Sequence, residues 1–278
     1  TLVIAPDAYV QSGDAVGAAT GMITINNAVN SYCESRQDCF GILGTFYGQT
    51  AAQAVTSTGS LNGISYSAVY YPWIKVGEPL SNGTIWTPPV GAIAGVYART
   101  DQSRGVHKAP AGQEAVTKGV IELKTPVTNA LNSTLLPAKI NPVRFFQGAG
   151  NLVWGTRTLA VDASWKYVPV RRLLIYIEES ILKGIQWSVF EPNDTALWAK
   201  LRLNISAFLM NTFRAGALAG TKPSEAFYVN CDSATNPQSL IDAGQVNVEV
   251  GVAPVKPAEF VIVKIGLWDG GKLLSEIG

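Results

Sequence analysis

The chain has 278 residues, of which 47% are hydrophobic and 15% are charged, a composition typical of a folded globular protein. Twenty-one Lys and Arg residues against twenty Asp and Glu residues leave a net charge of +1, so no overall field favours nucleic acid or an anionic membrane. No apolar run reaches the roughly 20 residues of a membrane span. We therefore expect neither a nucleic-acid partner nor membrane insertion.

Cysteine usage indicates a reducing compartment. Cys33, Cys39 and Cys231 are too few and too scattered for a disulfide framework, and none belongs to a CxxC pair. We expect three isolated, partly buried thiols, with a Cys33–Cys39 disulfide as the alternative. The first residues show no signal-peptide pattern, and the chain opens at Thr1 inside a predicted strand, so we also expect a fragment of a longer protein.

The first hundred residues alternate strand and helix signals. Three short apolar runs predict buried strands at residues 2–5, 39–43 and 67–71. Apolar residues between positions 22 and 32 recur at helical spacing, with Thr20 as the predicted N-cap. The tract 77–89 is rich in Gly and Pro and predicts a loop, and Pro89 suits the first turn of the helix that follows. Buried strands that alternate with helices predict a layered, largely parallel α/β sheet.

The middle of the chain predicts a junction between two units. Residues 104–142 contain many Gly, Pro, Ala, Asn and Thr residues and little periodicity. We place a first domain at 1–140, a second at 141–268 and a C-terminal tail at 269–278. Residues 143–159 predict two strands around a tight turn.

The second domain is predicted to consist of helices packed on a sheet, an α+β arrangement. Leu174, Ile177 and Ile181 mark one face of a first helix, and a second helix begins after the EPND signal at 191–194 and ends at Gly216. The predicted strands are residues 225–232, 245–251 and 259–268.

The apolar segment near the C-terminus has the features of an exchanged strand. Residues 261–265 are apolar on both faces apart from Lys264, so this strand should be covered on both sides. A covered strand beside a chain end is the arrangement from which strand exchange between copies arises most easily. The predicted strand-exchange residues are Phe260, Val261, Ile262, Val263, Lys264, Ile265, Leu267 and Trp268.

Residues with catalytic chemistry are sparse. His107 is the only histidine, which excludes a multi-histidine metal site, and no GxSxG motif surrounds any serine. Glu178 and Glu179 are adjacent on a predicted helix and point to different sides, and the glycine-rich segment 148–151 lies between strands rather than before a helix. We expect no catalytic residue, no cofactor and no metal, with a serine hydrolase that uses His107 as its base as a remote alternative.

The segment 139–172 carries a local excess of positive charge. Its basic residues face a single acid, Asp162, and are Lys139, Arg144, Arg157, Lys166, Arg171 and Arg172. Such a patch either forms a solubilising face or docks an acidic partner surface, where charge sets register and on-rate more than affinity.

Short motifs occur in a fixed order along the chain. In the first half these are YPWIKV at 71–76, PP at 88–89, GVYARTD at 95–101 and RGVHKAPA at 104–111. In the second half they are NPVR at 141–144, VWGTRTL at 153–159, YVPVRRL at 167–173, IEESI at 177–181, FEPND at 190–194, EAFYVNCD at 225–232 and APVKPAEFVI at 253–262. Together the motifs span most of residues 66–265 and resemble the tail sheath proteins of contractile-tailed bacteriophages, the myophages, whereas residues 1–65 match only loosely.

The resemblance implies a structural assembly protein rather than an enzyme. Sheath proteins stack in helical rings around an inner tail tube, and contraction drives the tube through the bacterial envelope for genome ejection. The implied partners are further copies of the chain, the tail tube protein, the baseplate and the tail terminator. The implied location is the virion tail, which is assembled in the cytoplasm of the host bacterium.

The resemblance also implies a fold. Its central domain is subtilisin-like without the protease site, since His107 occupies the place where relatives usually carry Trp. In similar sheaths, N- and C-terminal arms add strands to a sheet in neighbouring subunits, and here we expect the N-terminal arm to be missing. The implied candidates for contact with the tube or a neighbour are Arg144, Arg157, Lys166, Arg171 and Arg172. A sheath from a tailocin or a type VI secretion system is the alternative.

Overall fold

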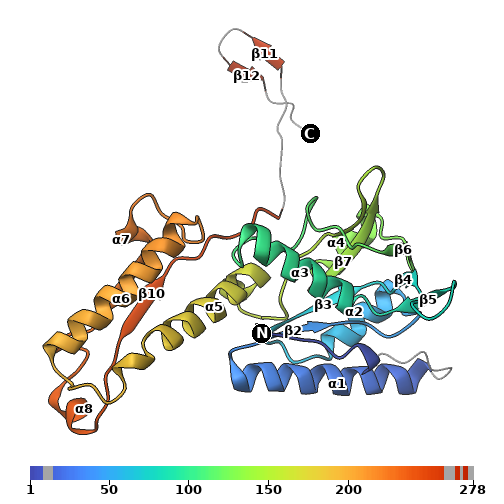
Figure 1. Cartoon of the computed structure of the whole chain (residues 1–278). Helices are drawn as coiled ribbons and strands as arrows, with labels where there is room; N and C mark the ends of the chain where they lie inside the picture. The colour runs from blue at the N-terminus through green and yellow to red at the C-terminus, as the bar shows by residue number, and fades with distance from the viewer. Residues whose placement is uncertain (9–14, 260–266, 270–271, 275–278) are drawn as a thin grey trace.

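The computed structural model describes residues 1–8, 15–259, 267–269 and 272–274 (Figure 1). These residues form a central unit built on a parallel sheet and a C-terminal unit of two long helices on a small sheet. The predicted α/β class, with an α+β C-terminal part, is confirmed. No helix in these ranges is long and apolar enough to cross a membrane.

A five-stranded sheet lies at the centre of the first unit. In spatial order its strands are β1 (Leu2–Val3), β2 (Phe40–Leu43), β3 (Ser67–Tyr71), β7 (Ile140–Phe146) and β8 (Gly150–Val153). The first four pair in parallel, and β8 returns antiparallel to β7. Every residue of β3 is buried, as a parallel sheet with both faces covered requires. The strands predicted near residues 2–5, 39–43 and 67–71 are therefore confirmed.

Helices cover both faces of this sheet. The long helices are α1 (Ala15–Arg36) and α3 (Val90–Arg104), and the shorter ones are α2 (Ala51–Gly59) and α4 (Asn129–Leu135). Because successive strand residues point to opposite faces, Phe40 and Tyr70 pack with Tyr97 of α3, whereas Val69 packs with Leu135 of α4 on the other face. The predicted cap at Thr20 is wrong, since α1 already begins at Ala15 in an alanine-rich run that favours helix.

A second sheet corrects the loop predicted at 77–89. Its antiparallel strands are β5 (Thr84–Thr87), β4 (Ile74–Gly77) and β6 (Val120–Leu123), in that order. Pro79 and Gly83 lie in the turn between β4 and β5, where the amide of Glu78 donates to the carbonyl of Gly83, whereas Pro88 and Pro89 follow β5. The sequence TIWT that follows the turn has high β-propensity and pairs with β4.

The C-terminal unit consists of two helices that cover a two-stranded sheet, as predicted. The helices are α5 (Val168–Gly184) and α6 (Thr195–Arg214), and the antiparallel strands are β9 (Phe227–Asn230) and β10 (Glu249–Val252). The side chain of Asp194 caps α6 by accepting from the amide of Leu197 at 2.8 Å, and Gly216 follows its end with a φ of 77°. The shorter elements are α7 (Pro223–Ala226), α8 (Gln238–Asp242) and three 3₁₀ turns, η1 (Pro6–Ala8), η2 (Ala163–Trp165) and η3 (Gln186–Ser188).

The strands of the small sheet are shorter than predicted. The start of the first is taken by α7, where Glu225 accepts from the amide of Thr221 at 2.8 Å. The second begins only at Glu249, because the side chain of Asn236 bonds both the amide and the carbonyl of Asn247 and takes the place of a strand partner. Side-chain capping of this kind competes with the strand ladder.

The central sheet extends beyond residue 140, where we predicted the end of the first domain. Strands β7 and β8 pair with β3 and continue the sheet to Val153. The preceding tract, which resembled a junction, contains β6 and α4, and Leu135 of α4 is fully buried against the sheet. The predicted boundary therefore falls inside one continuous sheet.

Helix α5 joins the two units. Its residues Val168 and Ile175 pack in the core beneath α3, whereas Leu173 and Ile177 pack in the core of the C-terminal unit. Figure 1 shows the helix running from the central unit to the far end of the C-terminal unit. A single helix that contributes to two cores couples the positions of both units.

Candidate assembly site

Within the described residues, each strand of the small sheet β9–β10 pairs with only one other strand, so both of its edges are unpaired. Val229 and Val250 pair across the sheet and face α5 and α6, so one face is covered. On the other face the ring of Tyr228 lies over Gly251, and Tyr228 is 55% exposed. Unpaired edge strands are templates for strand addition from another chain.

The predicted strand-exchange residues are only partly placed. Phe260, Val261, Ile262, Val263, Lys264 and Ile265 lie outside the described residues. Leu267 and Trp268 lie in β11 (Leu267–Asp269), which pairs antiparallel with β12 (Lys272–Leu274) of the same chain. In the described ranges, β11 and β12 form a sheet separate from β9 and β10.

A strap at residues 253–259 leads from the small sheet back to the central unit. At its start, the amide of Ala253 donates to the carbonyl of Ala226 at 2.8 Å, and its carbonyl accepts from Ala219 at 2.7 Å. The amide of Val255 donates to the carbonyl of Ala217 at 3.2 Å. The first part of the strap is thus fixed to the C-terminal unit.

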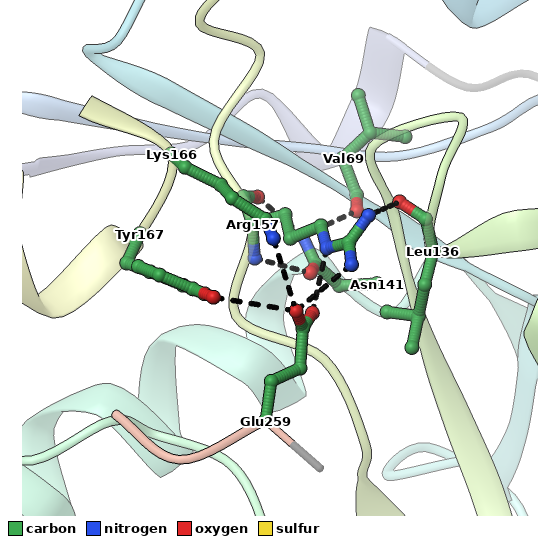
Figure 2. Close-up of polar contacts among 7 residues, drawn as sticks. All are labelled: Val69, Leu136, Asn141, Arg157, Lys166, Tyr167 and Glu259. Atoms are coloured by element: carbon green, nitrogen blue, oxygen red, sulfur yellow. Dashed lines mark hydrogen bonds and ion pairs between the residues drawn. The ribbon is translucent and has the colours of Figure 1, made fainter. Parts of the chain in front are cut away.

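The end of the strap is fixed to the central unit by Glu259 (Figure 2). Arg157 donates to both carboxylate oxygens, with Nε 2.6 Å and Nη2 2.8 Å away. Lys166 Nζ lies 3.3 Å from Oε2, and the hydroxyl of Tyr167 donates to the same oxygen at 3.4 Å. The side chains of Arg157 and Glu259 are 12% and 9% exposed, so this is a buried, bidentate ion pair.

Arg157 is itself held by the central sheet. Its Nη1 donates to the carbonyl of Leu136 at 2.7 Å. Its amide donates to Oδ1 of the buried Asn141 at 2.6 Å, and Nδ2 of Asn141 donates to the carbonyls of Arg157 and of Val69 in β3 (Figure 2). Residues of the central unit therefore hold in place the arginine that binds the carboxylate of Glu259.

Burial and the neighbouring charges act in opposite directions on the pKa of Glu259. Burial raises the pKa of this carboxyl group, but hydrogen bonds and charges from Arg157 and Lys166 outweigh burial and hold the pKa below its ordinary value. Glu259 is therefore ionised at neutral pH, and its charge is matched inside the molecule.

Arg171 and Arg172, which we predicted as contact residues, are buried at the joint between the units. The guanidinium of Arg171 lies 3.5 Å from the ring centroid of Trp165 and 4.3 Å from that of Tyr66. Arg172 forms an ion pair with Asp101 at the end of α3. Both side chains serve internal contacts, so the predicted docking patch does not form as one solvent-facing surface.

The other predicted contact residues are dispersed. Arg144 donates to Asn129 Oδ1 at 2.7 Å and to the carbonyl of Val127 at 3.1 Å. Lys166 and Arg157 converge on Glu259, a residue that the sequence did not single out. The structure thus brings together two of the five predicted cations, around a carboxylate more than ninety residues away in the chain.

A cleft of about 670 Å³ lies between the strap and the central unit, with Trp154 and Lys108 on one side and Val255 and Ala258 on the other. His107 lies at this cleft, and its pKa is lowered by burial and by the charge of Arg104. Its ring lies against Gly105, whose φ of 88° favours glycine. The described residues contain no cluster of three His, Cys, Asp or Glu side chains that could hold a metal ion.

The chain is similar to curated sheath proteins. It is 32% identical over 178 residues to the tail sheath protein of Vibrio phage KVP40, covering 63% of this chain and 26% of that protein. It is 24% identical over 261 residues to the tail sheath protein of Enterobacteria phage T4, covering 86% of this chain and 38% of that protein. The chain therefore spans well under two thirds of the length of these relatives.

Solved structures from injection systems are also similar. The sheath complex of an extracellular contractile injection system, PVC, in its contracted state matches at 35% identity with a TM-score of 0.80, over 95% of this chain and 70% of that chain. The baseplate of the anti-feeding prophage, AFP, contains a chain that matches at 35% identity with a TM-score of 0.79, over 90% of this chain and 66% of that chain.

Two family models divide the chain between them. The model of the phage tail sheath protein central domain matches residues 14–159, which include the whole of β7 and β8. The model of the phage tail sheath C-terminal domain matches residues 160–267, which include α5, α6 and the small sheet. The chain belongs to the phage tail sheath protein family.

Proposed function

We propose that this chain is the polymerising part of a structural subunit of a contractile sheath. Copies assemble in helical rings around a tail tube, and contraction drives the tube through a bacterial envelope. The observation that carries the proposal is the sheet β9–β10, whose edges are unpaired within the described residues, in a chain that continues past Glu259 into the apolar residues 260–268. The relatives named above are sheath proteins, which supports the same role.

Strand exchange supplies the links between copies in this proposal. An added strand contributes several main-chain hydrogen bonds of about 1 kcal/mol net each, and apolar burial adds roughly 25 cal/mol per Å². Since every copy both gives and receives a strand, the links persist while the subunits change their packing. Helix α5, which belongs to both cores, supports movement of each subunit as one body.

The proposed partners are further copies of the chain, the tail tube protein, the baseplate and the tail terminator. The proposed location is the virion tail after assembly in the bacterial cytoplasm, and the proposed role involves no catalysis. For contact with the tube or a neighbour we keep Arg144 and Lys166, which are partly exposed, because the side chains of Arg157, Arg171 and Arg172 are almost fully buried inside the subunit.

A sheath of a tailocin or of another injection system is the second candidate. It is supported by the 35% identity of this chain to the PVC and AFP structures, which come from injection systems. The mechanism is the same in both cases, and the difference lies in whether the tube delivers a genome.

Deletion of residues 261–278 tests the proposal. The full-length gene product and the deleted protein are each purified, concentrated with and without the tube protein, and imaged by negative-stain electron microscopy. We expect striated hollow tubes from the full-length protein and folded single particles from the deletion, because β9–β10 then receives no strand. Tubes formed by the deleted protein would contradict strand exchange through this segment. Failure of the full-length protein to form tubes even with tube protein would contradict the proposed function.

A further inference from the structure

We propose that Glu259 is the latch that fixes the root of the C-terminal arm on the central unit of each subunit. The receptor consists of Arg157, Lys166 and Tyr167. This inference rests on the proposed function, since it concerns the point from which the exchanged segment leaves its own subunit. Glu259 acts as a positioning residue, because it touches no neighbouring chain itself in this role.

The strap has two attachments on different units. Val255 is held by the carbonyl of Ala217 in the C-terminal unit, and Glu259 is held by Arg157 in the central unit. Between them the chain passes along the cleft described above, and Pro257 has no amide hydrogen to donate. The carboxylate of Glu259 therefore fixes the point from which the chain continues into residue 260.

The receptor is built independently of the strap. Leu136 and Asn141, which belong to the central unit, hold Arg157 through hydrogen bonds that do not involve Glu259. A guanidinium held in this way points its Nε and Nη2 groups in a fixed direction, so both can donate to one carboxylate. The position of Glu259 thus follows the central sheet rather than the C-terminal unit from which the strap comes.

This coupling has a consequence for assembly. The target of an exchanged strand, β9–β10, belongs to the C-terminal unit of a neighbour, whereas the root of the arm is fixed to the central unit of its owner. A fixed root restricts the volume that the arm explores, which raises its effective concentration at the neighbouring sheet. If the root is released, the effective concentration of the arm at the neighbouring sheet falls. Fewer copies are then linked in the same way.

Three full-length variants test the latch. Glu259→Gln removes the charge and keeps the length, Glu259→Asp keeps the charge and shortens the reach, and Glu122→Gln removes an exposed ion pair with Lys75 as the matched control. Hydrogen exchange is measured on unassembled subunits, and tube formation is measured by electron microscopy. A core variant such as Ile93→Ala, matched to Glu259→Gln in its shift of the unfolding midpoint, separates positioning from stability.

We expect Glu259→Gln to exchange at least tenfold faster at the amides of Val255, Lys256, Ala258 and Glu259, with the central sheet unchanged, and to form at least tenfold fewer ordered tubes. Glu259→Asp should be intermediate, and Glu122→Gln and Ile93→Ala should behave like the wild type in assembly. Unchanged exchange in the strap, or wild-type tubes from Glu259→Gln, would overturn the latch. If the wild type forms no tubes, the proposed function fails, and the exchange rates still decide whether Glu259 holds the strap.

Discussion

Arg172 near the start of α5 donates to Asp101 near the end of α3, with Nη1 2.9 Å from Oδ1. Its guanidinium also lies 4.6 Å from the ring centroid of Tyr97. Because α3 belongs to the central unit and α5 continues into the C-terminal unit, this pair fixes the two units where they meet. The side chain of Arg172 is 9% exposed, so water screens the pair much less than a surface ion pair.

Replacement of Arg172 by Met should destabilise the protein by about 2 kcal/mol, since it leaves the carboxylate of Asp101 without its partner in a partly buried site. Urea denaturation measures the loss. The matched control is Lys183→Met, which breaks the exposed i,i+4 pair with Glu179 and should cost no more than about 0.5 kcal/mol. Equal losses in the two variants would contradict a structural role for the Arg172 pair.

Replacement of Arg171 by Lys should also destabilise the protein, by about 1 kcal/mol. The planar guanidinium stacks on Trp165 and lies over Tyr66, and its Nε donates to Ser65 at 2.8 Å. A compact ammonium cannot stack in this way or reach the same acceptor. Arg36→Lys at the exposed end of α1 provides the control, and its unfolding midpoint should stay at the wild-type value. Unchanged stability of the Arg171→Lys variant would refute the importance of the stack.

Local sequence signals predicted the elements that local interactions determine. The strand Ser67–Tyr71 is an apolar run closed by Pro72, and helix α6 has its cap at Asp194 and a glycine after its end. Prediction failed where tertiary pairing decides. Strand β5 forms because it pairs with β4. Strand β7 extends the central sheet past residue 140 because it pairs with β3.

The candidate site was harder to predict than the fold. Glu259 is one carboxylate before an apolar run, and its partner Arg157 lies 102 residues away, so no local pattern links them. The cations between residues 139 and 172 are close in sequence, but β7, β8 and α5 place them on different sides of the unit. The motifs NPVR, VWGTRTL and APVKPAEFVI contain Asn141, Arg157 and Glu259, and they were the only signal for this cluster.

The contribution of Glu259 to stability should depend on pH. The folded-state pKa is lowered against burial by Arg157 and Lys166, so the stabilisation is present above the ordinary Glu pKa of about 4.3 and is lost as the pH falls through the folded-state value. At pH 7, Glu259→Gln should cost about 3 kcal/mol, because it leaves Arg157 buried without its counter-charge.

Urea denaturation of the wild type and of Glu259→Gln over a pH series measures this contribution. Arg157, Lys166 and Tyr167 are the groups that face the carboxylate, and their contacts weaken when Glu259 takes up a proton, so the difference in unfolding free energy should shrink below about pH 4. A difference that stays constant from pH 7 into the acid range would contradict an ionic contact.

The thiols of Cys33 and Cys39 should react slowly in the folded protein. Both are free, as predicted, but they are fully buried and contact each other instead of being isolated; burial, together with the hydrogen bond that Cys33 donates to Cys39, raises the pKa of Cys33 to about 12. The reactive thiolate is therefore scarce at pH 8. Labelling with a disulfide reagent should be at least a hundredfold slower than in denaturant, where all three cysteines become accessible. Rapid labelling of Cys33 in the folded protein would show that α1 opens readily from β2.

Gly251 and Tyr228 should be energetically coupled on the outer face of the small sheet. A Cβ at residue 251 would overlap Cε1 of Tyr228, so Gly251→Ala must displace the ring from β10. We expect the substitution to cost about 1 kcal/mol in the wild type, because the displaced ring loses its contact with the strand.

A double-mutant cycle tests this coupling. In the Tyr228→Ala background the obstacle is gone, and Gly251→Ala should then cost little or even stabilise β10, since alanine loses less conformational freedom than glycine on folding. The cycle, measured by urea denaturation, should therefore give a coupling energy of about 1 kcal/mol. Additive effects would mean that the ring does not rest on Gly251, and the outer face of β9–β10 would then be open to an incoming side chain at that position.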